Sequence, residues 1–375
     1  MKKISQKAAA LFTIFFLFVF LTATILRSKG QVSYHENRKL AAIPEITFSG
    51  IADGSYFAQL GDFFADQFAG RSKWTSLKAS LDAEIGESIV NGVYIKGDML
   101  LDISEKLYPE KIEADEINKF VDSYEGAVYF AAVPSSSGVY SEFLPDYMDK
   151  GKEKSQIDSL YEILDPRIKK IDAYNILKMQ NDNYIYYRSD SKWTGYGAYC
   201  VYRTVIQKLG FQPTEYDKYT IEHVSGDFLG NLYNKSQYKK IKADMLDIYT
   251  YPDGAEVLSC TGINEDGTEA DGEIYNREFI NSNNMYRLYL GNDIPLINIK
   301  TSLKNDRKLL VIKNDYADCF IPFLIQHFSE ISIVSPKCLK TGMSGLLNQK
   351  EYSQTLFLFG IDEFPDSSTL SMINK

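Results

Sequence analysis

Histidine and tryptophan are scarce, with three His and two Trp among 375 residues. Histidine is the commonest general base, so the scarcity of histidine limits which catalytic schemes are possible. Lys and Arg (41) are outnumbered by Asp and Glu (50), and the formal net charge is −9. Such a chain has no obvious means of holding a phosphate backbone, so we expect no nucleic-acid partner. Hydrophobic residues (45%) and charged residues (24%) are present in globular proportions, which argue against disorder, collagen-like repeats and a multi-span membrane protein.

Cysteine is also scarce, and none of the four residues shows the close spacing of a zinc site. A domain of about 345 residues can bury a large core without disulfides. We therefore expect unpaired thiols, with Cys319 and Cys338 the first pair to test for a disulfide. The four residues are Cys200, Cys260, Cys319 and Cys338.

The long hydrophobic run lies near the N-terminus, where residues 8–26 carry no charge. As a helix, this run would span about 28 Å, close to the thickness of a bilayer's hydrocarbon core. Lys2, Lys3 and Lys7 precede it, which orients the N-terminus toward the cytoplasm. We expect residues 1–29 to be an uncleaved anchor in the cell membrane, with the main domain outside the cell. A cleaved secretory signal is the alternative.

After the anchor, we expect a juxtamembrane linker at 30–54 and one α/β domain at 55–375. Apolar residues at helical spacing predict two core-facing helices at the start of that domain. Short strands are predicted on either side of Gly97. The apolar residues of the two helices are Phe57, Leu60, Phe64, Phe68, Trp74, Leu77 and Leu81.

Further along, strongly apolar strands alternate with helices, which implies a mostly parallel sheet covered on both faces. Residues 212–285 alternate polar and apolar stretches, and predict a β-rich insertion with a mobile acidic loop at 264–273. The predicted strands are 128–133, 184–187, 309–312, 331–334, 356–359 and a short one starting at Ile171, and the predicted helices are 114–124, 155–164, 197–209 and 320–328.

Ligands of open α/β sheets bind beyond the carboxyl ends of the strands. Three polar segments follow predicted strands here, at 133–137, 188–193 and 313–316. Gly291, Asn292 and Asp293 form a turn-like fourth segment. We expect the functional site where these segments meet.

Several of these segments resemble the DHHW proteins, which are secreted or membrane-anchored and occur mostly in Gram-positive bacteria. Those proteins are similar to the alginate O-acetylation proteins, and the resemblance implies an SGNH-hydrolase-like three-layer sandwich following an N-terminal membrane helix. It covers most of the chain beyond the anchor. It rests on ENRKL and IPE within 36–46, DQF-GR at 66–71, NGVYI at 91–95, VP…Y…LP at 133–145, YYR-D--WTGYGAY at 186–199, GDFLGNLY at 226–233, LLVIK-DYA-CF-PFL at 309–324 and the TLFLFG strand.

The resemblance implies a Ser–His–Asp arrangement, with Asp and His from a D-x-H-W segment, Ser from a D-S-Y turn, and oxyanion donors from a backbone N–H and a Gly-Asn segment. Asp190 and Trp193 match this pattern. Lys192, however, stands at the histidine position, and Asp315 stands at the serine position after Asn314. Loss of the base or the nucleophile costs on the order of 10⁶ in kcat in a triad enzyme. We predict that no catalytic residue is intact.

The replacements suggest that Lys192 and Asp315 form an ion pair that plugs the cleft, since a lone buried charge is costly. Asp190, Asp293 and Asp315 could hold a hard cation, but Lys192 in their midst argues against a metal, and we expect no cofactor. An aromatic-lined cleft could stack on sugar faces, although several of its tyrosines are expected to serve the core instead. Its residues are Tyr186, Tyr187, Trp193, Tyr196 and Tyr316. The candidate binding residues are Trp193, Gly291, Asn292, Asn314, Tyr316 and Ser135.

The three histidines offer little as a replacement base. His35 lies beside the anchor and His327 on a core-facing helix, which leaves only His223 to consider.

The sequence thus favours a membrane-anchored extracellular domain that has lost catalysis and binds or scaffolds polysaccharide at the cell envelope. The alternative is an O-acetyltransferase or esterase that acts on an envelope polysaccharide through non-standard residues. A third possibility is a structural partner of a membrane acyltransferase.

Overall fold

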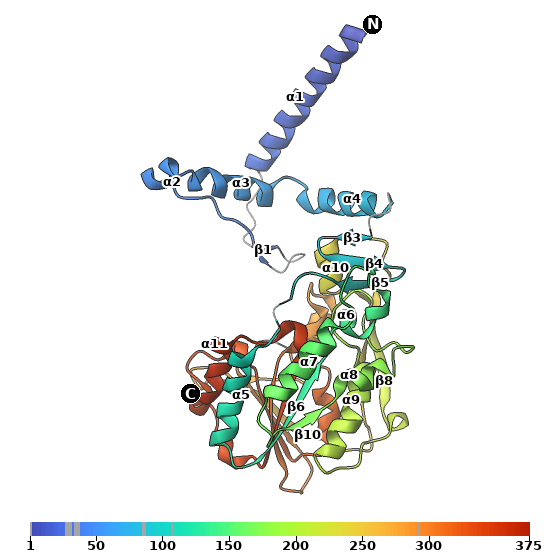
Figure 1. Cartoon of the computed structure of the whole chain (residues 1–375), viewed down its shortest axis with the longest axis vertical. Coiled ribbons are helices and arrows are strands. Elements are labelled where there is room, and N and C mark those ends of the chain that lie inside the picture. Colours follow the sequence, from blue (N-terminus) through green and yellow to red (C-terminus); the bar gives the residue numbers. More distant parts are fainter. Residues whose placement is uncertain (1, 27–31, 34–37, 85–87, 107, 292) are drawn as a thin grey trace. The chain divides into compact units, whose positions relative to one another are not determined.

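The computed structural model describes residues 2–26, 32–33, 38–84, 88–106, 108–291 and 293–375 (Figure 1). The chain divides into two compact units. Unit 1 comprises Met1–Asn91 and Tyr233–Lys240, and unit 2 comprises Gly92–Leu232 and Ile241–Lys375.

Unit 1 is mainly helical. A search of the described residues finds no helix whose length and apolar character suffice for a membrane span. Thr47 caps the second helix by accepting a hydrogen bond from the Gly50 amide at 3.1 Å. The elements are α1 (Lys2–Leu26), β1 (Val32–Ser33), β2 (Arg38–Lys39), α2 (Phe48–Ala52), α3 (Ser55–Gln67), α4 (Arg71–Glu84) and β3 (Ile89–Val90), and α10 (Asn231–Ser236) ends in this unit.

The two amphipathic helices predicted from the aromatic spacing are confirmed as α3 and α4. The expectation that their apolar residues face a core is wrong. Phe57 is 61% exposed, and Trp74 and Leu81 are 43% and 50% exposed. Helical periodicity identifies a face but not what covers it, so a solvent-facing stripe and a core-facing stripe look the same in the sequence.

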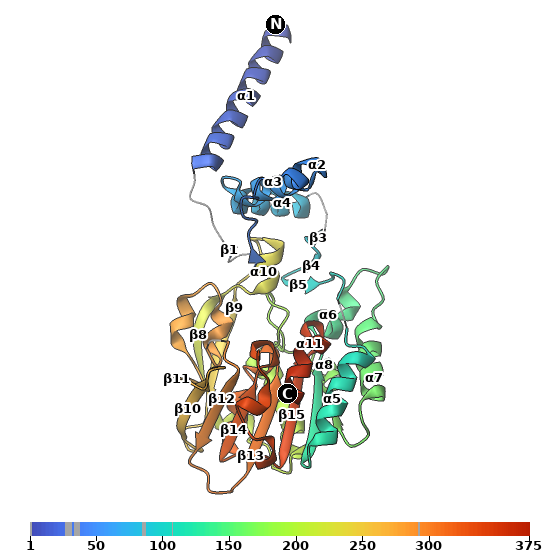
Figure 2. The ribbon, with the colours of Figure 1, turned by 90° about the vertical axis from the view of Figure 1, so that its left-hand side faces the viewer.

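Unit 2 is built on an eight-stranded mixed sheet in the order β11-β10-β12-β14-β13-β15-β6-β7 (Figure 2). The strands from β14 to β7 pair in parallel, and those from β11 to β14 pair antiparallel. The mixed α/β architecture with a largely parallel sheet is therefore confirmed. The strands are β6 (Ala127–Val133), β7 (Lys169–Ile171), β10 (Val257–Ile263), β11 (Glu269–Asp271), β12 (Leu296–Thr301), β13 (Lys308–Lys313), β14 (Glu330–Val334) and β15 (Gln354–Gly360).

Both faces of this sheet are buried, as the apolar runs predicted. Leu309 and Val311 of β13 point into one core, while Leu310 and Ile312 point into the other. The first core includes residues of α8 (Ala173–Lys178), α9 (Gly195–Lys208) and the 3₁₀ helix η6 (Ile321–Gln326). The second includes residues of α5 (Lys111–Ser123), α7 (Lys152–Ile163) and α11 (Ser367–Leu370).

The region 212–285 is β-rich, as predicted, but only part of it stands apart from the main sheet. The hairpin β8 (Thr220–Phe228) with β9 (Asp244–Thr250) forms its own two-stranded sheet, whereas β10 and β11 extend the central one. The predicted acidic loop at 264–273 is wrong, because β11 lies within it and pairs with β10.

The structure differs from the predicted secondary structure in several short segments whose hydrophobic pattern is weak. Residues 184–187 form only an isolated bridge between Tyr186 and Trp193, and the segment predicted as a helix at 320–328 is the 3₁₀ helix η6. Ile171 ends β7 instead of starting a strand. The short strands around Gly97 are confirmed as β4 (Val93–Lys96) and β5 (Met99–Asp102).

Candidate functional site

Two segments that the sequence singled out are bonded to each other in unit 2. The indole N–H of Trp193 donates to the Tyr316 carbonyl oxygen at 2.6 Å. In return, the Tyr316 hydroxyl donates to the Ser191 carbonyl oxygen at 3.0 Å. Both rings are fully buried. These bonds place the segment before α9 directly against the turn after β13.

Asp190 is buried and held by backbone donors. Its carboxylate accepts hydrogen bonds from the Lys192 amide at 3.0 Å and from the Asn231 amide at 2.8 Å. Gly230 packs so closely that a Cβ there would collide with the Asp190 side chain. Asp190 is thus fixed in place by the segment that leads into α10.

Lys192 occupies the position of the family's histidine and carries its charge into a buried setting. Its Nζ lies 3.0 Å from a Glu363 carboxylate oxygen and 3.9 Å from one of Asp190. It also lies over the rings of Tyr286 and Tyr316, at 5.5 and 5.7 Å from their centroids. Burial lowers the pKa of Lys192, but the attraction of Glu363 and Asp190 outweighs it and holds the pKa above its ordinary value. The ammonium is therefore charged.

Asp315 occupies the position of the family's serine. Its carboxylate accepts from Lys337 Nζ at 2.6 Å, and the same ammonium lies 2.8 Å from Asp293. Burial raises the pKa of Asp315, but Lys313 and Lys337 outweigh it and lower that pKa to about 2. Asp315 is therefore ionised at neutral pH.

The predicted ion pair between Lys192 and Asp315 is wrong. Among the described residues, the ion pairs of Lys192 within 4.0 Å are with Glu363 and Asp190, and that of Asp315 is with Lys337. Asp315 still raises the pKa of Lys192 at longer range. Both charges are therefore compensated, but Lys192 and Asp315 each pair with a different residue of opposite charge.

Asn314 joins the turn after β13 to the loop after β15. Its side-chain oxygen accepts from the Gly360 amide at 2.9 Å and from the Tyr316 amide at 3.3 Å. Its side-chain nitrogen donates to the carbonyl oxygens of Gly360 and Glu363, both at 3.1 Å. Asn314 thus caps the 3₁₀ helix η5 (Asp315–Ala317) and positions the backbone of Glu363.

Glu363 and Lys337 are not singled out by the sequence analysis, although the sequence contains a signal for both. Each follows a predicted strand of the parallel sheet, Lys337 after β14 and Glu363 after β15. Since parallel strands share one carboxyl edge, the same rule that selected 313–316 would have selected them.

Ser135 belongs to a second polar cluster, which is largely buried. Its hydroxyl donates to Glu153 at 2.8 Å and accepts from Lys106 Nζ at 2.9 Å, while Ser137 accepts from the same ammonium at 3.0 Å. Burial lowers the pKa of Lys106, but Glu153 and Asp362 hold it above its ordinary value. A lysine held protonated cannot act as a base toward Ser135, which instead caps the short helix α6 (Ser136–Val139).

The remaining candidates are placed as follows. Gly291 has a left-handed backbone with φ of 76°, and the neighbouring Asn292 lies outside the described residues, as does His35. His327 is buried with its Nε2 2.6 Å from the Tyr202 hydroxyl, and burial lowers its pKa to about 4. His223 pairs with Asp247 at 2.6 Å on the hairpin β8–β9. The two described histidines thus bond to Tyr202 and Asp247, and neither bonds to Lys192 or Asp315.

The aromatic residues considered for sugar stacking serve the core, as expected. Tyr186, Tyr187, Trp193 and Tyr316 are each at most 1% exposed, and Tyr196 is partly buried. All four cysteines are free thiols, so the proposed test pair Cys319 and Cys338 is not a disulfide. No three His, Cys, Asp or Glu side chains within the described ranges are grouped so as to hold a metal ion.

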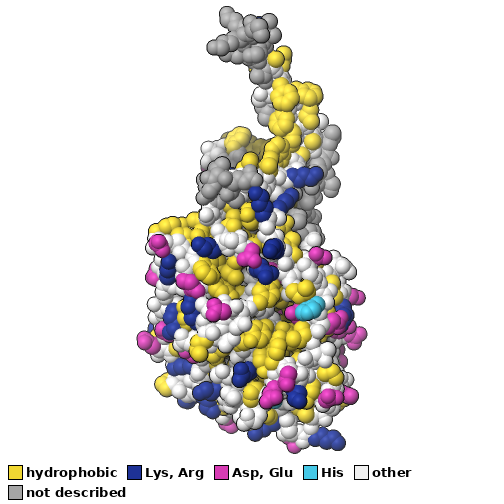
Figure 3. Space-filling model, turned by 90° about the vertical axis from the view of Figure 1, so that its right-hand side faces the viewer, with side chains coloured by type: hydrophobic (Ala, Val, Ile, Leu, Met, Phe, Trp, Pro, Cys, Tyr) yellow, Lys and Arg dark blue, Asp and Glu magenta, His cyan; other side chains and the backbone are white. Residues whose placement is uncertain are grey.

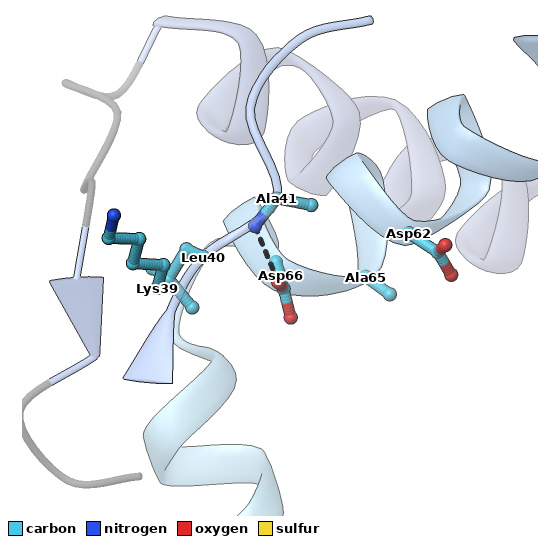
Figure 4. Close-up of a pocket in the computed structure, with 6 residues that line it drawn as sticks. All are labelled: Lys39, Leu40, Ala41, Asp62, Ala65 and Asp66. Atoms are coloured by element: carbon cyan, nitrogen blue, oxygen red, sulfur yellow. Dashed lines mark hydrogen bonds between the residues drawn. The ribbon is translucent and has the colours of Figure 1, made fainter. Parts of the chain in front are cut away.

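A separate pocket of about 390 Å³ lies within unit 1 (Figure 4). It is lined by Lys39, Leu40 and Ala41 on one side and by Asp62, Ala65 and Asp66 of α3 on the other. The Asp66 carboxylate accepts from the Ala41 amide at 2.8 Å, which fixes the chain before α2 against α3. None of the triad positions contributes to it.

A model of the family described as DHHW protein matches residues 127–334, just over half of the chain. The chain belongs to the DHHW family. The matched region contains Asp190, Lys192 and Asp315, so the altered positions lie inside the family's own domain.

Solved structures show the same fold as this DHHW protein. A DHHW family protein from Eubacterium siraeum is similar with a TM-score of 0.62 and 22% identity, covering 75% of this chain and 95% of its own. PatB1 from Bacillus cereus, solved with a sulfonyl adduct, is similar with a TM-score of 0.61 and 19% identity, covering 74% and 96%. The O-acetyltransferase domain of AlgJ from Pseudomonas putida is more distant, with a TM-score of 0.43, 10% identity, and coverage of 75% and 99%. No curated protein matches the chain.

Proposed function

We propose that this chain is a non-catalytic member of the DHHW family that binds or scaffolds polysaccharide at the cell envelope. One observation carries the proposal. Lys192 and Asp315, which stand at the base and nucleophile positions, are both charged and are neutralised by separate partners, Glu363 and Lys337. The fold around them is intact.

Neither side chain is in a state suited to the role that its position has in the family's triad. A base must offer a lone pair near neutral pH, and a protonated lysine has none. A nucleophile must be freed for attack, whereas the Asp315 carboxylate is bound to Lys337 at 2.6 Å. Polysaccharide as the ligand class is supported by membership of the DHHW family, which resembles the alginate O-acetylation proteins.

We propose further that α1 attaches the chain to the cell membrane and leaves unit 2 outside the cell. The uncharged residues 8–26 and the preceding Lys2, Lys3 and Lys7 support this. An extracellular domain would then meet the envelope polymers directly.

The test combines binding and turnover on one polymer. The full chain in detergent is co-sedimented with insoluble, O-acetylated cell-wall polysaccharide from a Gram-positive bacterium, and released acetate is measured in the supernatant. We expect the chain to sediment with the polymer while acetate stays at the level of a protein-free control. Asp315→Asn is expected to sediment equally well.

Acetate release, or acetyl transfer to a second polymer, that is lost in Asp315→Asn would overturn the proposal in favour of an O-acetyltransferase or esterase with a carboxylate mechanism. Failure of the chain to sediment would overturn polysaccharide binding.

A further inference from the structure

Large hydrophobic side chains are exposed at high density in one short part of the chain, residues 43–81 of unit 1. Unit 2 is about seven times as long as this segment, and its exposed hydrophobic residues are scattered. Soluble surfaces seldom keep apolar patches of this extent without a use for them. Those within residues 43–81 are 36–91% exposed: Ile43, Ile46, Phe48, Ile51, Phe57, Phe64, Phe68, Trp74, Leu77 and Leu81.

These residues form stripes on the two longer helices. Phe57 and Phe64 of α3 are seven positions apart, and Phe68 follows four later. Trp74, Leu77 and Leu81 of α4 are spaced by three and four. Both spacings return to the same helix face. On α3, the acidic Asp62 and Asp66 fall on the opposite side by the same geometry, so that helix is amphipathic with its apolar face outward.

The stripes are continuous with the apolar surface of α1. The Phe20 ring stacks on Phe68 at 5.4 Å between centroids and meets Trp74 at 5.8 Å. Phe16 meets Trp74 at 6.4 Å, and the Ala69 amide donates to the Thr24 hydroxyl at 3.1 Å. Hydrophobic side chains also cover α1 itself (Figure 3).

These contacts fix how far along α1 from its C-terminal end Phe68 and Trp74 lie. Phe20 lies six residues before Leu26, the last residue of α1, which is about 9 Å at 1.5 Å per residue. Whatever medium surrounds the last two turns of α1 must therefore also surround Phe68 and Trp74. An amphipathic helix on a bilayer buries its apolar face by about 5–10 Å, which is the same depth.

We propose that the exposed apolar faces of α2, α3 and α4 insert into the outer leaflet of the membrane, at the lipid–water boundary beside α1. This inference rests on the proposed anchoring of α1. The occupant is lipid because Phe68 and Trp74 pack directly on the apolar Phe16 and Phe20 of α1. Trp is favoured at that boundary, and the exposed Lys73 beside Trp74 can extend its ammonium group to the headgroups.

The chain carries its own probe for this. Of its two tryptophans, Trp74 is 43% exposed on the proposed surface, while Trp193 is fully buried in unit 2. The full chain is reconstituted into phosphatidylcholine vesicles whose acyl chains are brominated near the headgroup, and fluorescence is compared with that in unbrominated vesicles. Flotation on a density gradient measures membrane attachment in the same samples.

We expect the chain to float and its emission to fall about twofold in brominated vesicles, because bromine quenches tryptophan on contact and Trp74 lies at the interface. The matched variant Trp74→Phe retains only Trp193 and should show no quenching. A second variant, Phe48→Asp with Phe57→Asp, changes exposed side chains and so should fold, but should weaken the quenching of Trp74.

A chain that floats while Trp74 is quenched by aqueous iodide and not by bromolipid would overturn the insertion of α2–α4 and leave the anchor standing. A chain that does not float would overturn the anchor and the insertion together. Association of two copies in vesicles, with Trp74 shielded from both quenchers, would replace lipid by a second copy and overturn the inference as well.

Discussion

At the scale of single residues, the charges of the altered site are balanced in two separate groups. Lys192 is paired with Glu363 and Asp190, and Asp315 is paired with Lys337. A buried charge left without a partner is costly, so each substitution at a triad position is matched by a residue of opposite charge. The two lysines differ in exposure, since the Lys192 side chain is 10% exposed and that of Lys337 is 41% exposed, whereas Glu363 and Asp315 are alike at 36% and 35%.

A double-mutant cycle measures the interaction energy between Lys192 and each of its candidate ion-pair partners. In a Trp74→Phe background, urea unfolding followed by Trp193 fluorescence gives the free energy of unfolding of unit 2 for Lys192→Met, Glu363→Gln and the double variant. We expect a coupling of about 0.5–1 kcal/mol, since Glu363 is partly exposed and screened by water. The matched cycle of Lys192→Met with Asp315→Asn should give a smaller coupling. An equal or larger coupling with Asp315 would contradict the pairing described here.

The ionisation of Asp315 gives a pH-dependent prediction. Its pKa of about 2 lies below the value of about 4 for an unfolded chain, so its contribution to stability is complete above pH 4 and is lost as the pH falls from about 4 to 2. Lys337→Met removes an opposing charge and should move the pKa upward. Carbon-13 NMR of the Asp315 carboxyl measures both values, and a wild-type carboxyl that titrates near pH 4 would refute the assignment.

The sequence identified the altered positions but not their partners. Lys192 and Asp315 could be located because they stand at the histidine of the family's D-x-H-W motif and at the serine of its D-S-Y motif. Glu363 is 171 residues from Lys192, and Lys337 is 22 residues from Asp315. No motif marks either partner, and only the shared edge of the parallel strands brings them to the site.

At the scale of elements, Asn314 is the connection that holds two strand ends together. It makes four hydrogen bonds at 2.9–3.3 Å, three of them to the segment 360–363 beyond β15. These bonds fix the backbone of Glu363, whose side chain is the ion-pair partner of Lys192.

Replacement of Asn314 tests this element. Asn314→Ala should lower the free energy of unfolding by about 2–4 kcal/mol, because it leaves the buried amide and carbonyl groups of Gly360 unpaired. Asn348→Ala is the matched control, since Asn348 caps an exposed 3₁₀ turn through one bond to the Lys350 amide. Its cost should be below about 1 kcal/mol. Equal losses in urea unfolding would show that the connection is unimportant.

Elements with a strong pattern were predictable from the sequence, and elements that depend on tertiary pairing were not. The apolar strands β6, β13, β14 and β15 were recognised because few arrangements other than a doubly covered sheet bury such runs. Strand β12 is not predicted by the sequence analysis, and a strand is wrongly predicted at 184–187. In such short polar or aromatic segments, pairing with neighbouring strands decides the conformation more than the intrinsic preference of the residues does.

At the scale of the whole molecule, the chain combines a family domain with a segment of different physical character. Unit 2 buries its apolar residues in two cores, whereas unit 1 exposes many of those in its helices. The sequence predicted one domain from residue 55 onward, because a helical stripe does not reveal whether a protein core or lipid will cover it. The mixed α/β fold, by contrast, follows from the strand pattern alone.

If this DHHW protein is non-catalytic, as we propose, it forms no acyl-enzyme. The most direct measurement is the intact mass of the full chain during incubation with an activated acetyl ester, alongside the rate of ester cleavage. We predict an unchanged mass and cleavage at the rate of a protein-free control. A stable or transient acetyl adduct mapped to any residue between 313 and 319, with cleavage above that control, would contradict the account.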